Sequence, residues 1–289
     1  MAGVAFGCQL PQETGDFEKL AGIAERCESL GYDSVWAYDH LAPYWTQRGQ
    51  SFECWTVLAA IAQRTTRIKL GSLVTNVNLR SPALLAKIAS TFDNVSKGRL
   101  ILGLGTGDRM SRNELLSYGY PFSSIKERVE RLRETILIIK SMWTRDRTTF
   151  EGRYIRISNA VNYPKPIQRP HPPIWVGGKH VRILEIVAEM ADGWNYWGLD
   201  REMLARRAQY LSNKCAKVGR QPDEIVKSWA GTLCRTLRRG GSRTELEQNI
   251  RDQLLKETDH ETRYFIGSFG PSADTLAYET FAGAVKSLE

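Results

Sequence analysis

The chain of 289 residues carries 40 lysines and arginines against 32 aspartates and glutamates, a formal net charge of +8, and 42% of its residues are hydrophobic. This size and composition suit one large α/β domain or two small ones. No apolar run approaches the length of a membrane span and the first ten residues lack a signal-like pattern, so we expect a cytoplasmic protein without membrane contact.

The cysteines and the basic residues further restrict the class of protein. The five cysteines are scattered, odd in number and without Cys-x-x-Cys spacing, which favours a reducing compartment and argues against a disulfide scaffold or a zinc site. Arginines gather at residues 201–207 and 235–243, but no recognition motif accompanies them, so a nucleic-acid partner is not expected. A solvated helix face explains these clusters better, and the positive charge also suits an anionic cofactor.

The predicted elements alternate between strands and helices along the chain. Short apolar runs indicate the strands, and apolar residues at helical spacing indicate the helices between them. This alternation with short connections is typical of a parallel sheet wrapped by helices. Strands are expected at residues 4–8, 33–37, 67–74, 100–104, 174–176, 192–195 and 228–237, and helices at 16–30, 53–64, from 82 onward, 126–143, 181–190, 202–219 and 244–255.

Two insertions and an irregular end interrupt this pattern. Residues 108–125 are expected to be irregular, and residues 145–170 to hold a small hairpin outside the sheet. Seven strand–helix units predict a (β/α)8 TIM barrel that forms a single domain over residues 1–289. A strand at 263–268 leads almost directly into a helical tail at 273–288, which leaves too little chain for a further helix and a closing strand. We therefore expect the eighth βα unit to be shortened or missing.

The stretch from Gly98 to Asp108 is the strongest candidate for the site. Leu100 to Leu104 indicates a buried parallel strand, and glycines at 103, 105 and 107 should open its carboxyl end into a turn that carries Thr106 and Asp108. Ligands collect at such strand ends. The spacing Gly-x-Gly-x-Gly, with no helix expected directly behind the turn, argues against a Rossmann fingerprint. The alternative to a ligand site is a tight turn of structural importance only, in which Asp108 acts as a cap.

Two further signals point to the same end of the sheet. Gly177 and Gly178 precede a predicted helix, whose N-terminus favours an anion, and Lys179 adds a positive charge. Aromatic side chains follow several strand ends and could stack on a flat apolar substrate or a cofactor. These predicted substrate-binding residues are Tyr44, Trp45, Tyr196 and Trp197.

Ten motifs across about residues 3–268 occur in the order known from one protein family. They are LPQ (10–12), LGYDSVW (30–36), DH (39–40), LGSLVT (70–75), PALLAK (82–87), GRL (98–100), GLGTG (103–107), PKP (164–166), PPIWVGG (172–178) and ADGWN (191–195). On these motifs the chain resembles the luciferase-like flavin and deazaflavin oxidoreductases, most of all the branch that uses coenzyme F420. The resemblance agrees with the barrel inferred from alternation.

The resemblance implies a site at the barrel mouth. His40 matches a histidine beside the cofactor ring in deazaflavin sugar-phosphate dehydrogenases, and Asp108 falls where those enzymes carry a catalytic glutamate, so both are candidate catalytic residues. Structural alternatives are a backbone-bonded histidine and a loop cap, and aspartate is one carbon shorter than glutamate. A bulge with a non-proline cis peptide is expected at Leu73-Val74. The implied cofactor-binding residues are Asp39, Leu73, Val74, Thr75, Asn76, Thr106, Gly107, Gly177, Gly178, Lys179 and Trp194.

Three functions follow from the resemblance. The first is hydride transfer between coenzyme F420 and an apolar or aromatic small molecule, since residues 197–199 (Trp-Gly-Leu) stand where sugar-phosphate enzymes carry lysines. The second is an FMN-dependent two-component monooxygenase supplied by a separate flavin reductase. The third is a non-catalytic flavin-binding relative, which a collapsed pocket would support. The family favours a homodimer, and no metal site is expected.

Overall fold

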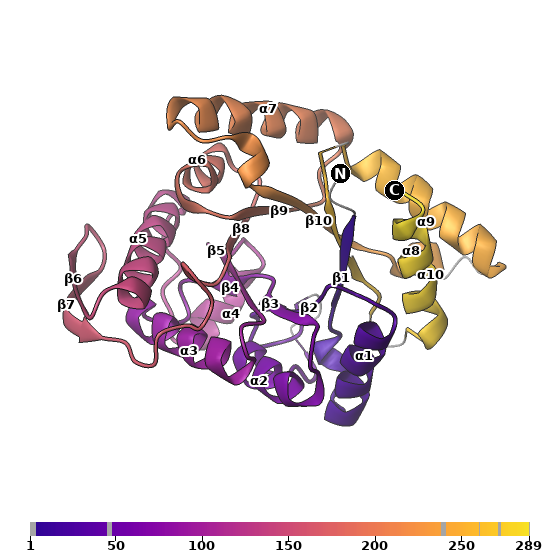
Figure 1. Ribbon diagram of the computed structural model, residues 1–289, viewed down its shortest axis with the longest axis horizontal. Helices are drawn as coiled ribbons and strands as arrows, with labels where there is room; N and C mark the ends of the chain where they lie inside the picture. The colour runs from indigo at the N-terminus through magenta and orange to yellow at the C-terminus, as the bar shows by residue number, and fades with distance from the viewer. Residues whose placement is uncertain (1–3, 45–47, 238–240, 260, 271–272, 289) are drawn as a thin grey trace.

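The computed structural model describes residues 4–44, 48–237, 241–259, 261–270 and 273–288. Eight parallel strands close into a barrel, and helices surround it in a ring (Figure 1). β1 pairs with both β2 and β11, and β3 pairs with β5, so the ring has no open edge among these strands. The barrel strands are β1 (Ala5–Gln9), β2 (Ser34–Ala37), β3 (Lys69–Ser72), β5 (Leu100–Gly105), β8 (Ile174–Gly177), β9 (Gly193–Trp197), β10 (Val226–Thr232) and β11 (Tyr264–Ser268).

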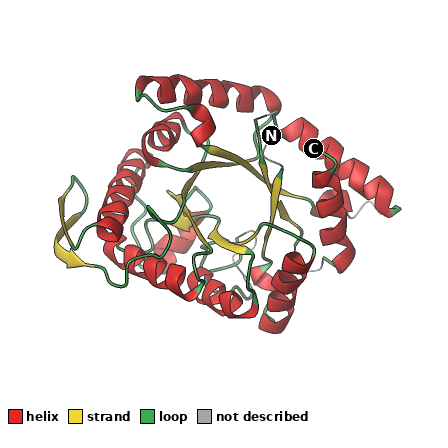
Figure 2. Cartoon of the chain, in the orientation of Figure 1, coloured by secondary structure: helices red, strands yellow, loops and turns green. Residues whose placement is uncertain are grey.

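The outer helices begin at recognisable capping residues. Asp16, Ser81 and Ser124 each accept a backbone N–H bond at the start of a helix, and Pro82 occupies a first-turn position as the sequence predicts. The helices form a ring around the strands (Figure 2). Their apolar side chains belong to the core that packs against the outside of the barrel. The outer helices are α1 (Phe17–Ser29), α2 (Cys54–Arg64), α3 (Pro82–Val95), α5 (Ile125–Thr144), α6 (Val181–Met190), α7 (Arg201–Lys217), α9 (Arg243–Glu257) and α10 (Thr275–Lys286). Two short 3-10 turns, η1 (Gln12–Thr14) and η2 (Pro222–Glu224), lie between elements.

An aromatic cluster fills the interior of the barrel. The rings of Trp36 and Trp175 lie 5.1 Å apart, and those of Trp175 and Tyr264 lie 5.0 Å apart. Glycine is required opposite these rings, because a Cβ at Gly71 would lie 2.3 Å from Trp36. The filled interior is a packed core, so a ligand site must lie at one end of the barrel.

The prediction of a shortened or missing eighth unit was wrong. The run at residues 263–268 is itself the eighth barrel strand, β11, and it pairs in parallel with β1 and β10. The helical tail is its partner helix, α10. Pairing of β11 with β1 closes the ring of eight strands.

The predicted 145–170 insertion contains the expected hairpin, β6 (Arg147–Glu151) and β7 (Arg156–Val161), which forms a separate two-stranded sheet beside α5. The buried carboxylate of Glu134 on α5 accepts backbone N–H bonds from the hairpin turn. The expectation of no helix behind Asp108 was wrong, because α4 (Ser111–Ser117) begins three residues later in the irregular insertion.

Two strand ends also differ from prediction. The third predicted strand divides into β3 and a short β4 (Thr75–Asn76), and the seventh ends at Thr232 before a short helix, α8 (Cys234–Leu237).

Candidate functional site

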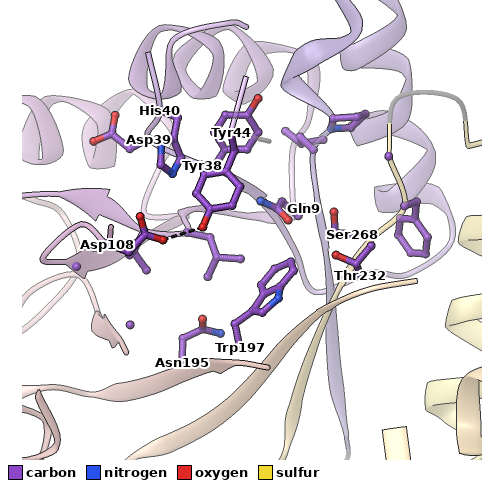
Figure 3. A pocket seen from close by; sticks show the side chains of 18 of the residues that line it. Gln9, Tyr38, Asp39, His40, Tyr44, Asp108, Asn195, Trp197, Thr232 and Ser268 are labelled. Carbon is purple, nitrogen blue, oxygen red and sulfur yellow. Dashed lines mark hydrogen bonds between the residues drawn. The ribbon is translucent and has the colours of Figure 1, made fainter. Parts of the chain in front are cut away.

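A cavity of about 900 Å³ opens at the carboxyl ends of the barrel strands (Figure 3). All eight barrel strands contribute residues at or just after their ends, as expected for a parallel barrel. Of the residues predicted for the site, those that line the cavity are Asp39, His40, Tyr44, Leu73, Val74, Asn76, Thr106, Gly107, Asp108, Gly177, Gly178, Lys179 and Trp197. Trp45 lies outside the described residues.

His40 is held by a carboxylate that the sequence analysis did not select. Glu114 on α4 lies 2.9 Å from Nδ1 of His40 and also accepts the backbone N–H groups of Leu41 and Ala42. Its side chain is fully buried, whereas that of His40 is 18% exposed. The histidine therefore presents its other nitrogen, Nε2, away from this fixed contact.

The charge on Glu114 decides the tautomer of His40. Burial raises the pKa of Glu114, but hydrogen bonds from His40 and from the two backbone N–H groups outweigh burial, and its pKa lies below the usual value. An ionised carboxylate only accepts hydrogen bonds, so Nδ1 carries the proton and Nε2 of the neutral ring can accept one. No local pattern indicates this contact, because 74 residues separate the two side chains.

Asp108 occupies the turn after β5 and is hydrogen-bonded to Tyr44. The Tyr44 hydroxyl donates to its carboxylate at 2.7 Å (Figure 3). Ser111 donates through its backbone N–H at 2.9 Å. Burial raises the pKa of Asp108, but these hydrogen bonds outweigh it and the pKa lies below the ordinary value. The Tyr44 ring lies 4.7 Å from the His40 ring, so the ionised Asp108 fixes an aromatic hydroxyl beside His40.

Asp39 lines the cavity, but its carboxylate is already hydrogen-bonded to Arg80 and to the backbone of Asn76. Arg80 donates to both of its oxygens, at 2.7 and 3.0 Å, and the backbone N–H of Asn76 donates at 3.0 Å. The guanidinium also reaches Glu53, at 2.6 Å. This arrangement ties the end of β2, and with it His40, to the segment after β4.

The bulge predicted at Leu73-Val74 is present, with a non-proline cis peptide. The Val74 side chain enters a hollow that exists because its neighbours are glycines. A Cβ at Gly105 would lie 2.4 Å from Val74, and one at Gly177 would lie 3.0 Å away. Gly103 and Gly105 thus belong to strand β5 and make room for the bulge, whereas the chain turns at Gly107, with φ of 68°.

The turn after β5 is fixed by a buried arginine that the sequence analysis also missed. Arg128 on α5 donates to the carbonyls of Thr106 and Gly107, at 3.0 and 2.6 Å. Asn78 donates to the same Thr106 carbonyl at 2.9 Å. The turn that carries Asp108 is therefore held by hydrogen bonds on the side of α5.

The loop after β8 brings Gly177, Gly178 and Lys179 to the cavity, next to the N-terminus of α6. Gly178 has φ of 137°, a conformation that favours glycine. Its carbonyl accepts the Trp194 indole N–H at 2.7 Å. The predicted cofactor contact of Trp194 needs correction, because the side chain is fully buried in the core outside the barrel and reaches the site through Gly178.

The predicted roles of Tyr196 and Thr75 also need correction, because neither side chain faces the cavity. Side chains alternate between the two faces of a strand, so Asn195 and Trp197 on β9 face the cavity while Trp194 and Tyr196 face the outer helices. Tyr196 is only 1% exposed and its hydroxyl lies 2.8 Å from that of Thr262, which is incompatible with the predicted substrate contact. Thr75 is likewise fully buried.

Uncharged polar side chains that the sequence analysis did not select complete the cavity. They stand at or beside the ends of their strands, and Figure 3 shows Asn195 beside Trp197 and Thr232 beside Ser268. Their position at strand ends is the signal that could have found them. These residues are Gln9, Asn195, Thr232 and Ser268.

Within the described residues, no helix is long and apolar enough to cross a membrane, and no group of three His, Cys, Asp or Glu side chains could hold a metal ion.

Comparison with known proteins agrees with this architecture. A chain of "F420-dependent secondary alcohol dehydrogenase in complex with an F420-acetone adduct" superposes with a TM-score of 0.84 over 98% of both chains. At 18% identity this likeness shows the fold alone.

Curated relatives are similar over part of their length. An F420-dependent glucose-6-phosphate dehydrogenase of Intrasporangium calvum is 34% identical over 177 residues, 61% of this chain and 52% of the relative. An F420-dependent hydroxymycolic acid dehydrogenase of Mycobacterium tuberculosis is 32% identical over 222 residues, 76% of this chain and 60% of the relative. The chain thus spans roughly half to three fifths of the length of these relatives. The family model for luciferase-like monooxygenases matches residues 2–279, and the chain therefore belongs to this family.

Proposed function

We propose that this protein is an oxidoreductase that transfers hydride between coenzyme F420 and an apolar or aromatic small molecule. The observation that carries the proposal is the His40–Glu114 pair at the mouth of an open cavity. The names of the similar dehydrogenases support the choice of cofactor. A collapsed pocket would have favoured a non-catalytic relative, but the cavity is open.

The residues around the cavity fit this cofactor. Val74 fills the hollow left by Gly105 and Gly177 and lines the floor of the cavity with Leu73 and Gly107, which offers a flat ring an apolar surface. Lys179 and His180 line the same side, where the N-terminus of α6 also favours an anionic group. We assign Leu73, Val74, Asn76, Thr106 and Gly107 to the ring side, and Gly177, Gly178 and Lys179 to the phosphate side.

Coenzyme F420, when bound, would supply the acceptor or donor of one hydride, that is, of two electrons and one proton. Oxidation of an alcohol removes a hydride from carbon and a proton from oxygen, and His40 is placed to take that proton on Nε2. In the reverse direction the same nitrogen returns the proton to a carbonyl oxygen. Glu114 keeps the ring oriented and stabilises it when both nitrogens are protonated. Asp108 and Tyr44 confine the oxygen-bearing end of the substrate beside His40.

Separate fluorescence titrations with coenzyme F420 and with FMN test the cofactor. Saturable F420 binding with much weaker FMN binding is expected, together with a change in F420 absorbance on addition of a substrate. The reverse preference would move the assignment to the two-component monooxygenase, which would then need a separate flavin reductase. Binding of neither would contradict both.

The homodimer predicted from the resemblance is part of the same proposal. Light scattering of the purified protein, with and without F420, measures its mass against the 32.7 kDa of one chain.

A further inference from the structure

The cavity has a second region, away from His40, that the proposed chemistry does not use. It is formed by residues 269–270 and 273–274 after β11 together with α8, α9, α10 and the end of β9. We call it the apolar lobe, and its large side chains are Trp197, Leu237, Leu246, Phe269 and Leu276. Phe269 is anchored against Tyr278 and Phe281, with ring centroids 4.7 and 5.5 Å away. The wall of the lobe is thus continuous with the packed core.

The charges of the cavity are distributed unevenly. The basic side chains that line it in the described part of the chain are the Lys179 ammonium and the imidazoles of His40 and His180, and they follow β2 and β8. Among the described residues of the apolar lobe none is basic, and the carboxylate at its rim, Asp274, caps α10. A phosphate placed there would lose its hydration without gaining a cationic partner among these residues.

Exposure of the lobe residues indicates where a ligand would gain most. Leu246 and Phe269 are 5% and 4% exposed, but Leu276 remains 40% exposed at the rim although it lines the cavity. An apolar chain lying from His40 towards Leu276 would cover this surface. Its oxygen-bearing end would face the polar side chains at the strand ends.

We infer that the substrate is an uncharged alcohol or carbonyl compound whose apolar chain occupies the apolar lobe between α8, α9 and α10. This inference rests on the proposed function for the position of the reacting carbon. Each methylene group that enters the lobe should tighten binding about fourfold until the lobe is filled.

The dependence of affinity on chain length is measured by calorimetric titration of the whole protein with methyl ketones, from butanone to dodecanone. This measurement does not require turnover. Titration with F420, and F420 oxidation or reduction with the same ketones and their alcohols, follow in parallel. Glucose 6-phosphate serves as the anionic comparison, because Arg238 and Arg239, which lie outside the described residues, follow Leu237 in the sequence.

Leu276→Gln is the test variant and Leu255→Gln the matched control. Both leucines are exposed, at 40% and 50%, but Leu276 lines the cavity whereas Leu255 lies at the far end of α9 from Leu246. Leu276→Gln should weaken the longer ketones by about tenfold and leave butanone nearly unchanged. Leu255→Gln should reproduce the wild-type series.

The results separate the two proposals. If ketone affinity rises with chain length and Leu276→Gln flattens that rise, the apolar lobe is supported. Should F420 fail to bind in the same experiments, only the proposed function is contradicted. Normal F420 binding with ketone affinities independent of chain length overturns the lobe and leaves the proposed function standing. Tighter binding of glucose 6-phosphate than of any ketone also overturns it.

Discussion

The two sides of the cavity are held in different ways. On the side of β2 to β5, charged and hydrogen-bonded pairs fix nearly every functional side chain: His40 on Glu114, Tyr44 on Asp108 and Asp39 on Arg80. On the side of β9 to α10, the wall is mainly packed apolar side chains and uncharged polar groups. Orientation matters where a proton moves, since bond geometry limits the reaction. Shape and apolar area matter for the proposed binding of an apolar chain.

Replacement of His40 should give the largest effect, and it tests the difference between the two sides of the cavity most directly. His40→Ala should lower kcat by about 10²- to 10⁴-fold, because the proton would lose its acceptor. Affinity for F420 should change little. Steady-state kinetics and fluorescence titration of the same preparation measure both quantities. Near wild-type turnover would mean that the hydrogen-bonded side is not the chemical side.

Arg80→Met tests whether this side is held by charge. Asp39 and Arg80 are 1% and 13% exposed, so the substitution leaves a carboxylate buried without its cation. We expect the free energy of unfolding to fall by about 3–5 kcal/mol, measured by urea denaturation.

Arg64→Met is the control for Arg80, because Arg64 is 37% exposed and pairs with the exposed Glu18 and Glu25. Arg64→Met should lower the free energy of unfolding far less than Arg80→Met does, because solvent screens exposed ion pairs. Equal losses for the two variants would show that the buried network contributes no more than a surface pair.

Glu114→Gln examines the positioning of His40. The amide keeps the size of the side chain but removes the charge that fixes the histidine tautomer, so kcat should fall about 10- to 100-fold with unchanged F420 affinity. Glu114→Asp should recover part of the loss if charge is the cause. A rise in KM alone would assign Glu114 to substrate binding instead.

The stability of the protein should depend on pH through Glu114. Its pKa is lowered in the folded protein, so its contribution to stability is complete above the unfolded value of about 4.3 and is lost as pH falls through the folded value. Urea denaturation of wild type and Glu114→Gln should therefore diverge least at acidic pH. A difference that stays constant from neutral to acidic pH would contradict this assignment.

Tyr44→Phe should produce the smallest effect. The variant keeps the ring beside His40 but removes the hydroxyl that donates to Asp108. Loss of one such hydrogen bond is worth about 1 kcal/mol, so kcat/KM should fall about fivefold. An unchanged kcat/KM would show that Asp108 is sufficiently held by Ser111, and the role of the Tyr44 hydroxyl would be withdrawn.

The sequence by itself determined the barrel and the end at which the site lies. Alternating apolar runs and helical periods depend on local spacing, and parallel strands bring their carboxyl ends to one face. For this reason His40, Tyr44, Asp108 and the Gly177–Lys179 loop meet at the cavity as predicted. The cis peptide at Leu73-Val74 was reached through family resemblance rather than through spacing.

The tertiary structure decided the contacts between distant segments. Closure of the barrel requires β1 and β11 to pair, and no local pattern shows that the chain ends meet. Glu114 reaches His40 because α4 folds over the end of β2, across 74 residues of sequence. Trp194 and Tyr196 were misplaced because the register of a strand, which decides whether a side chain faces the cavity or the helices, is set by its neighbours in the barrel.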